Sequence, residues 1–135
     1  MLAPSPARGV AFGDFDNDGS VDILVNNMNE LPSLLHNVSS NTNHWLKVKT
    51  IGTRSNRNGI GSRVSIFYGQ HGQTDEVRSG GSWASHSDLR VHFGLGSVDK
   101  LDRVEVRWPS GLTENLYDVR ADQLLVVREG AQASR

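Results

Sequence analysis

The sequence predicts an all-β fold: an antiparallel β-sandwich or barrel-like domain preceded by a small β-turn-β unit. Three observations lead to this prediction. Apolar and polar residues alternate with a period of two in several short segments, clusters of turn-forming residues separate these segments, and helical periodicity is nearly absent. The chain of 135 residues is long enough to bury a hydrophobic core and fits one domain with a small extra element.

The predicted strands of the larger domain each present one apolar face. The alternation gives three such sets: Leu46, Val48 and Thr50; Val64, Ile66 and Tyr68; Val104, Val106 and Trp108. Residues 124–127 form an unbroken apolar run, which predicts a more central strand. Pro109 and Gly111 predict a type I turn that closes a hairpin. We expect roughly nine or ten strands in total.

The remaining segments predict loops and domain boundaries. Residues 53–61 are polar and contain two glycines, so they predict a long exposed loop, while 30–37 and 119–124 could each hold a turn or two of helix. The polar segment 38–43 marks a composition shift. The predicted organisation is listed from the N-terminus: a flexible start at 1–8, the β-turn-β unit at 9–37, a linker at 38–43, the β domain at 44–130 and a loose tail at 131–135.

Composition lowers the probability of several classes of function. The 14 basic and 15 acidic residues are mixed without a basic run, so the sequence predicts neither nucleic-acid binding nor attachment to an anionic membrane. No cysteine is present, and no stretch approaches the roughly 18 apolar residues of a membrane span. Residues 1–8 do not resemble a signal peptide. The chain is therefore either cytoplasmic or a piece of a longer secreted chain whose targeting segment lies elsewhere.

The strongest candidate site is the aspartate-rich turn "DFDNDGSVD" at 14–22. Calcium takes six to eight oxygen ligands, which a short loop can supply if alternate side chains converge and a glycine permits a sharp bend. The predicted ligands are the side chains of Asp14, Asp16, Asp18 and Asp22 and the backbone carbonyl of Ser20. Val25 stands where an EF-hand needs glutamate, and strands rather than helices flank the loop, so we predict a calcium site of another type.

Two stretches carry a resemblance to known families. "RGVAFGDFDNDGSVDILVNN" resembles the FG-GAP/VCBS repeat, whose calcium loop joins two strands of a propeller blade. The ordered segments "NHWL", "NGIGSRV", "HFGLG", "WPSG" and "LLVVREG" resemble the ASPIC/UnbV domain of the secreted cartilage acidic protein-like family. The resemblance implies calcium ligation by the four aspartates, an extracytoplasmic setting and upstream propeller repeats, and for the ASPIC/UnbV domain it implies no established chemistry.

The resemblance to the repeat departs from the family pattern in two ways. The chain carries one repeat where members have several, which gives three strands where a blade has four. The Gly-Ala-Pro part of the repeat signature is also absent, and only Phe12-Gly13 remains.

A second candidate site is the glycine-rich stretch at 79–96. Loops that combine an aromatic side chain with polar groups often bind sugars or peptides. The candidate ligand-binding residues are Trp83, Ser85, His86, Asp88, Arg90 and His92. The alternative is that the tryptophan plugs the end of the core. Close spacing in one loop argues against a Ser-His-Asp triad, and no spacing of His71, His86 and His92 matches a zinc site.

These observations favour a non-enzymatic, calcium-binding β module of a secreted or cell-surface protein, which serves adhesion, matrix binding or binding of a protein or glycan ligand. One alternative is a carbohydrate-binding or carbohydrate-active enzyme domain that uses the 79–96 loop with Asp88 or Glu76 as a carboxylate. Another is a structural cap on an upstream β-propeller. Asn37 also begins a glycosylation sequon, which has meaning in a eukaryotic secreted protein.

Overall fold

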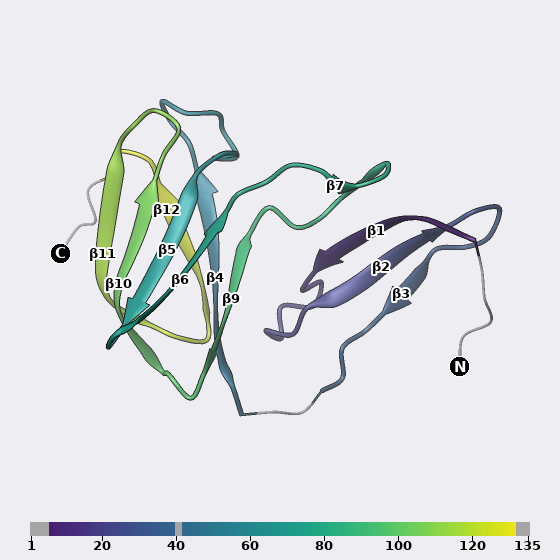
Figure 1. The fold of residues 1–135 in the computed structure, drawn as a ribbon, viewed down its shortest axis with the longest axis horizontal. Coiled ribbons are helices and arrows are strands. Elements are labelled where there is room, and N and C mark those ends of the chain that lie inside the picture. The colour runs from purple at the N-terminus through teal and green to yellow at the C-terminus, as the bar shows by residue number, and fades with distance from the viewer. Residues whose placement is uncertain (1–5, 40–41, 132–135) are drawn as a thin grey trace. The chain divides into compact units, whose positions relative to one another are not determined.

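A computed structural model describes residues 6–39 and 42–131, and in them every regular element is a β-strand (Figure 1). The all-β prediction is therefore confirmed. Twelve strands are present in this part of the chain, several of them only two or three residues long. The chain divides into two compact units, one formed by residues up to 40 together with 79–88, the other by 41–78 and 89–135. None of the described residues belongs to a helix with the length and hydrophobicity of a membrane span.

The first unit is a small antiparallel sheet in the order β1-β2-β3. Its strands are β1 (Ala7–Gly13), β2 (Asp22–Asn27) and β3 (Ser33–Leu35). The aspartate-rich turn connects β1 to β2, whose register pairs Gly13 with Asp22 at the mouth of the turn. The β-turn-β arrangement expected for this segment is therefore present.

Residues 79–88 belong to the first unit, although they lie far from it in sequence. They contain the short strands β7 (Gly81–Ser82) and β8 (Ser85–His86). Both contact β1 along the edge that does not pair with β2. The Ser85 hydroxyl donates to the carbonyl of Val10 at 2.6 Å, and the Asp88 amide donates to the carbonyl of Phe12 at 2.9 Å. This segment satisfies backbone groups that an open sheet edge would expose.

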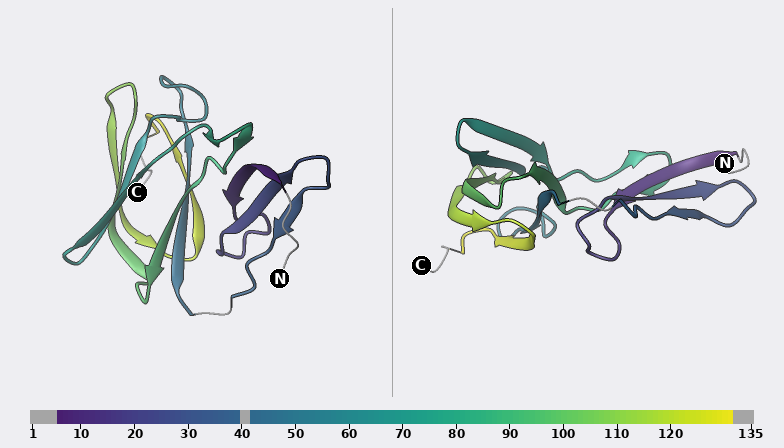
Figure 2. Two further views of the ribbon diagram at one scale, coloured as in Figure 1. Left: turned by 45° about the vertical axis from the view of Figure 1, so that its right-hand side comes forward. Right: turned by 90° about the horizontal axis from the view of Figure 1, so that it is seen from below.

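The second unit contains two sheets that lie as separate layers (Figure 2). One sheet has the order β11-β10-β5-β6 and the other β12-β4-β9. Their strands are β4 (His44–Ile51), β5 (Arg63–Tyr68), β6 (His71–Glu76), β9 (Val91–Gly96), β10 (Lys100–Arg107), β11 (Thr113–Arg120) and β12 (Gln123–Arg128). Buried residues of both sheets form one core that includes Leu46, Ile66, Val104 and Trp108. The predicted apolar faces are thus the ones that pack together in a β-sandwich.

The apolar run 124–127 does not form the central strand that its composition predicts. It lies in β12, which is an edge strand, and Leu124 and Val126 remain 41% and 50% exposed. β12 pairs with β4 in parallel, which departs from the antiparallel expectation. Because only one face of β12 packs against the core, Val127 is buried while its neighbours on the other face contact solvent.

Several expected boundaries differ from the structure. β1 begins at Ala7, so residues 7 and 8 are part of a strand, and 1–5 lie outside the described residues. Segment 30–37 contains β3, and residues 119–124 belong to β11, β12 and the turn between them, so neither contains helix. Residues 40 and 41 of the expected linker and 132–135 of the expected tail also lie outside the described part of the chain.

The turn at 108–111 forms as predicted. The amide of Trp108 donates to the carbonyl of Leu112 at 2.8 Å, and the amide of Gly111 donates to the carbonyl of Trp108 at 2.9 Å. The strands β10 and β11 then pair from Arg107 and Thr113 onward. The indole nitrogen of Trp108 donates to Glu114 at 2.6 Å, so a buried tryptophan keeps its polar atom bonded.

The loop at 52–62 is tied to the sandwich, although the sequence predicts a long exposed loop. Its anchor is Glu129, which is 2% exposed. One carboxylate oxygen of Glu129 accepts hydrogen bonds from the amides of 53–55 at 2.9, 2.7 and 2.7 Å, and the other accepts from the hydroxyls of Ser55 and Ser110. Five donors therefore converge on one side chain and join the loop to the 108–111 turn.

The ionisation of Glu129 reflects these contacts. Burial acts to raise its pKa because it disfavours the charged form. The Ser110 hydroxyl, the amides of Ser55 and Thr53 and the Ser55 hydroxyl lower the pKa, and together they outweigh burial. The pKa of Glu129 consequently lies well below its usual range, and the carboxylate is ionised when it holds the loop.

Gly59 is constrained in this loop both by its backbone conformation and by its neighbours. Its φ is +66°, and a Cβ added there would lie 2.4 Å from the Thr50 hydroxyl and 3.2 Å from the Trp108 ring. We expect Gly59→Ala to lower the free energy of unfolding by about 2–3 kcal/mol, measured by denaturant titration. Gly111→Ala is the matched control, because Gly111 also has positive φ but meets no atom within 4 Å. Equal losses in both variants would contradict a role for close packing.

Candidate metal centre

The aspartate-rich loop is shaped by two residues with left-handed backbone. Asn17 has φ of 63° and Gly19 has φ of 93°. Asparagine and glycine tolerate this conformation best, and the two bends reverse the chain between β1 and β2. The reversal turns alternate side chains toward the inside of the loop. The sequence therefore folds this segment so that its carboxylates face one another.

Three carboxylates converge inside the loop. Asp14, Asp16 and Asp22 each offer an oxygen atom, and these atoms lie within 4.8 Å of one another. Asp14 and Asp22 are both only 2% exposed, whereas Asp16 is open to solvent. Ionised carboxylates this close repel one another, and burial strengthens the repulsion because water no longer screens it. The arrangement therefore favours a cation among them.

Backbone amides hold the buried carboxylates in place. The oxygens of Asp14 accept from the amides of Asp18 at 3.1 Å and Gly19 at 2.7 Å. Asp22 accepts from the amide of Phe15 at 3.1 Å and from the amide of Asn37 at 2.8 Å. The last contact joins the loop to the chain that follows β3. These bonds orient the carboxylates before any ligand arrives, which lowers the entropic cost of binding.

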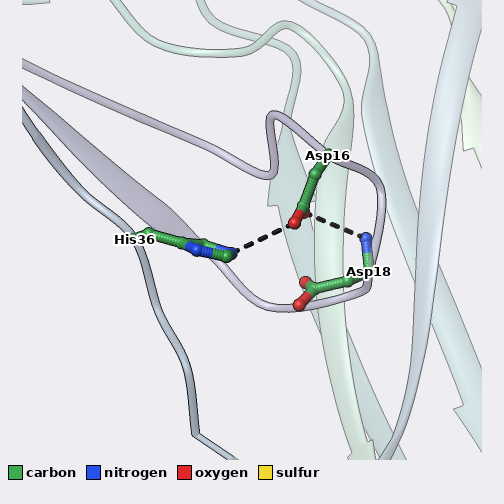
Figure 3. Close-up of side chains that lie close together, drawn as sticks. All are labelled: Asp16, Asp18 and His36. Atoms are coloured by element: carbon green, nitrogen blue, oxygen red, sulfur yellow. Dashed lines mark hydrogen bonds and ion pairs between the residues drawn. The ribbon is translucent and has the colours of Figure 1, made fainter.

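A second group overlaps the first and includes a histidine (Figure 3). Side-chain atoms of Asp16, Asp18 and His36 lie within 4.8 Å of one another, and His36 Nε2 lies 3.1 Å from Asp16 Oδ2. The Asp18 amide also donates to Asp16 at 3.3 Å. The His36 ring contacts Phe15 edge-on, with 5.3 Å between ring centroids.

The sequence alone does not indicate His36 as a candidate ligand. The residue follows the "LL" of β3, and its position beside the loop depends on the pairing of Ile23 with Leu35. A hydrophobic pattern gives no sign of this pairing in a strand of three residues. The sequence shows only a histidine directly after two leucines, and this pattern is too common on protein surfaces to indicate a metal ligand.

The donor set fits calcium better than other metals. The converging atoms are carboxylate oxygens, which hard cations prefer. Two oxygens bound to one calcium ion at about 2.3–2.6 Å lie at most about 5 Å apart, and the separation of up to 4.8 Å meets this limit. Asp14, Asp16 and Asp22 would hold the ion, whereas the Asp18 side chain lies with Asp16 and His36 in the second group. The predicted contribution of the Ser20 carbonyl stays a prediction, and the Ser20 amide donates to Asp18 at 2.7 Å.

The six candidate residues of 79–96 are divided between the two units. Trp83 is 69% exposed and lies in the first unit between β7 and β8, where the Ser85 hydroxyl and the Asp88 amide bond to β1. His86 contacts the carbonyl of the residue after it. Arg90 and His92 belong to the second unit, where the His92 ring stacks on Trp45 with 6.3 Å between centroids. Neither unit by itself contains all six.

Comparison with known proteins identifies the relationships of the chain. The family model described as ASPIC and UnbV matches residues 52–134. Cartilage acidic protein 1 from Mus musculus is 31% identical over 102 residues, which is 73% of this chain and 16% of that protein. The Homo sapiens protein of the same name is 31% identical over 102 residues, covering 73% of this chain and 15% of that protein.

A third relative is cartilage acidic protein 1 from Xenopus tropicalis, which is 30% identical over 107 residues and covers 76% of this chain. That match spans 16% of the relative, so the chain corresponds to a small part of these longer proteins. The second unit, with its two sheets and the loop held by Glu129, provides most of the region that the family model matches. On this match, the chain belongs to the ASPIC and UnbV family.

Proposed function

We propose that this chain is a calcium-stabilised, non-catalytic β module of an extracellular, matrix-type protein. The observation that carries the proposal is the convergence of Asp14, Asp16 and Asp22, with two of the three carboxylates buried. The similarity to proteins named cartilage acidic protein supports the extracellular setting. Millimolar extracellular calcium would fill even a weak site, since calcium sites of extracellular modules bind at about 10⁻⁴–10⁻³ M.

The first unit is proposed to be a repeat of the FG-GAP/VCBS type. Its support is the aspartate loop between two antiparallel strands and the third strand that follows. Residues 82–88 hydrogen-bond along the free edge of β1, where the fourth strand of a blade would lie, while β7 and β8 pair with each other in a separate sheet. A blade of four elements is what a propeller repeat requires. We accordingly propose that the unit follows upstream propeller repeats in a longer protein, and that the second unit caps them.

Calcium in this site would act on the structure of the first unit. The ion would neutralise the repulsion between Asp14 and Asp22. Because Asp22 also accepts a hydrogen bond from the Asn37 amide, the ion would stabilise the segment after β3 as well. No chemical step follows from this role. Adhesion or binding of a protein or glycan ligand would use other surfaces of the module.

Thermal unfolding with and without calcium tests the proposal. If the site binds calcium at about 0.1 mM, then 1 mM calcium adds about 1.4 kcal/mol to the free energy of unfolding and raises Tm by roughly 5 °C. Magnesium at 1 mM should raise Tm much less, because it keeps its water ligands. A midpoint that does not move between calcium and a chelator, together with no heat of calcium binding, would reject the proposal.

A second candidate function is ligand binding at Trp83. Its support is an indole 69% exposed on a hairpin that hydrogen bonds fix to β1. An exposed aromatic ring can stack on a sugar ring or enter a protein interface. A carbohydrate-active enzyme would in addition need a paired acid and base. Asp88 in the first unit or Glu76 in the second could supply one carboxylate.

A further inference from the structure

The second unit carries an open depression of about 970 Å³ beside the ends of two parallel strands. Its lining residues come from β4, β12 and the loop after β4: Lys49, Thr50, Ile51, Gly52, Thr53, Arg57, Asn58 and Arg128. Three of these residues are cations, and none is acidic. The depression is therefore a concentrated positive surface on a chain whose net charge is −1.

The three cations are available to a ligand. Lys49, Arg57 and Arg128 are exposed, and none of them takes part in an ion pair with another described residue. The carboxylate next to them in sequence, Glu129, is 2% exposed and already accepts five hydrogen bonds from the loop and the 108–111 turn. The negative charge of Glu129 therefore offsets little of the positive charge of Lys49, Arg57 and Arg128.

Strand register brings two of the cations together. In the parallel pair β4 and β12, Lys49 lies opposite Val126 and Ile51 lies opposite Arg128. Lys49 and Arg128 therefore share a face of the sheet as diagonal neighbours on adjacent strands. Both side chains are long enough to contact one anionic group held between them.

The loop after β4 brings the third cation to the same place. The amide of Gly52 donates to the carbonyl of Arg57 at 3.0 Å, which closes the loop back onto the end of β4. A Cβ added to Gly52 would lie 2.1 Å from the carbonyl oxygen of Asn56, so glycine permits this close approach. The Glu129 bonds to 53–55 hold the other side of the loop. Arg57 is thus fixed at the rim by backbone contacts.

The walls of the depression combine polar and apolar atoms. The side-chain amide of Asn58 makes no hydrogen bond within the described structure, so it can donate to or accept from a ligand. The volume is sufficient for two or three sugar rings, because pockets of about 300–1,000 Å³ bind drug-sized ligands. A concave recess that carries three cations and mixed polar and apolar walls suits a polyanion built of sugar rings better than a flat bilayer surface.

We propose that this depression binds the sulfate groups of an acidic polysaccharide. Sulfate esters present three oxygens to the forked guanidinium groups of Arg57 and Arg128 and to the ammonium of Lys49. Asn58 contacts sugar hydroxyls. The site is built only from the second unit, so it goes beyond the proposed calcium function and does not require the aspartate loop.

Titration calorimetry with a heparin-derived, sulfated hexasaccharide tests the proposal in the full chain at 1 mM calcium and 100 mM NaCl. We expect saturable binding that weakens as salt increases. The double variant Lys49→Gln with Arg128→Gln should lose at least about tenfold in affinity and keep its Tm. The matched control is Lys100→Gln with Arg120→Gln, a pair opposite each other on β10 and β11, which should bind within about twofold of the unmodified chain.

Four outcomes would overturn the proposal. Equal loss in the control pair would show that only net charge matters. Equal binding of the chemically desulfated hexasaccharide would exclude recognition of sulfate, and absence of binding would exclude the site. If vesicles containing phosphatidylserine bind and the same double variant abolishes that binding while the hexasaccharide does not bind, the depression is a lipid site instead.

A chelator that removes calcium stabilisation but leaves hexasaccharide binding intact would separate this site from the proposed calcium function.

Discussion

Glu129→Ala is expected to lower Tm by roughly 10 °C or more, the largest stability effect predicted for this chain. The substitution removes the acceptor of five hydrogen bonds and leaves the amides of 53–55 without their partner in the structure. Unsatisfied amides beside a buried position are costly because no protein acceptor replaces the carboxylate. Differential scanning calorimetry measures the change. Glu76→Ala is the matched control, since Glu76 is exposed on β6 and should shift Tm by no more than about 1–2 °C.

The same residue gives this prediction a pH signature. The pKa of Glu129 is lowered in the folded state, so its contribution to stability is complete above the pKa of the unfolded chain, about 4.5. The contribution is lost as pH falls below that value. Glu129→Gln should therefore show a smaller decrease in unfolding free energy between about pH 5 and pH 3 than the unmodified chain. Parallel pH profiles would contradict the assignment of the hydrogen-bonded carboxylate as ionised.

Asp16→Asn is expected to weaken calcium binding by about tenfold to a hundredfold, because calcium affinity depends on the number of charged ligands. Asp16 is exposed, and it contacts His36 and the Asp18 amide. The fold should not depend on its charge. Calorimetric calcium titration measures the affinity, and Tm in the presence of a chelator should equal that of the unmodified chain.

Two further variants separate metal binding from packing. Asp22→Asn should weaken calcium binding and also lower Tm in the chelator, because Asp22 is buried and accepts the amides of Phe15 and Asn37. Asp99→Asn should change neither quantity, since Asp99 is an exposed residue of the second unit. If Asp16→Asn binds calcium as tightly as the unmodified chain, the carboxylate cluster is not the site.

The sequence predicted the faces of the strands well because alternation is a local property. Val104, Val106 and Trp108 are buried on one face, and the turn at 108–111 forms where proline and glycine predict it. The position of β12 could not be predicted in the same way. Whether the run 124–127 is central or at an edge depends on which strands pair with it, and its parallel pairing with β4 joins residues far apart in sequence.

The site was predictable in part for the same reason. Asp14, Asp16 and Asp22 converge because their spacing fits one turn, which is local information. The contact of His36 with Asp16 and the contacts of residues 79–88 with β1 depend on tertiary pairing. Glu129 gave no sequence signal either, because a single glutamate after a strand acquires its role only when the loop at 53–55 folds over it.

The central claim is that the loop between β1 and β2 binds calcium. A crystal structure determined from crystals grown in 5 mM calcium, with anomalous diffraction data, tests it most directly. We expect an anomalous peak inside the loop with oxygens of Asp14, Asp16 and Asp22 at about 2.3–2.6 Å, and the carbonyl of Ser20 among the remaining ligands. A loop with no peak at this position, or with a water molecule hydrogen-bonded in its place, would contradict it.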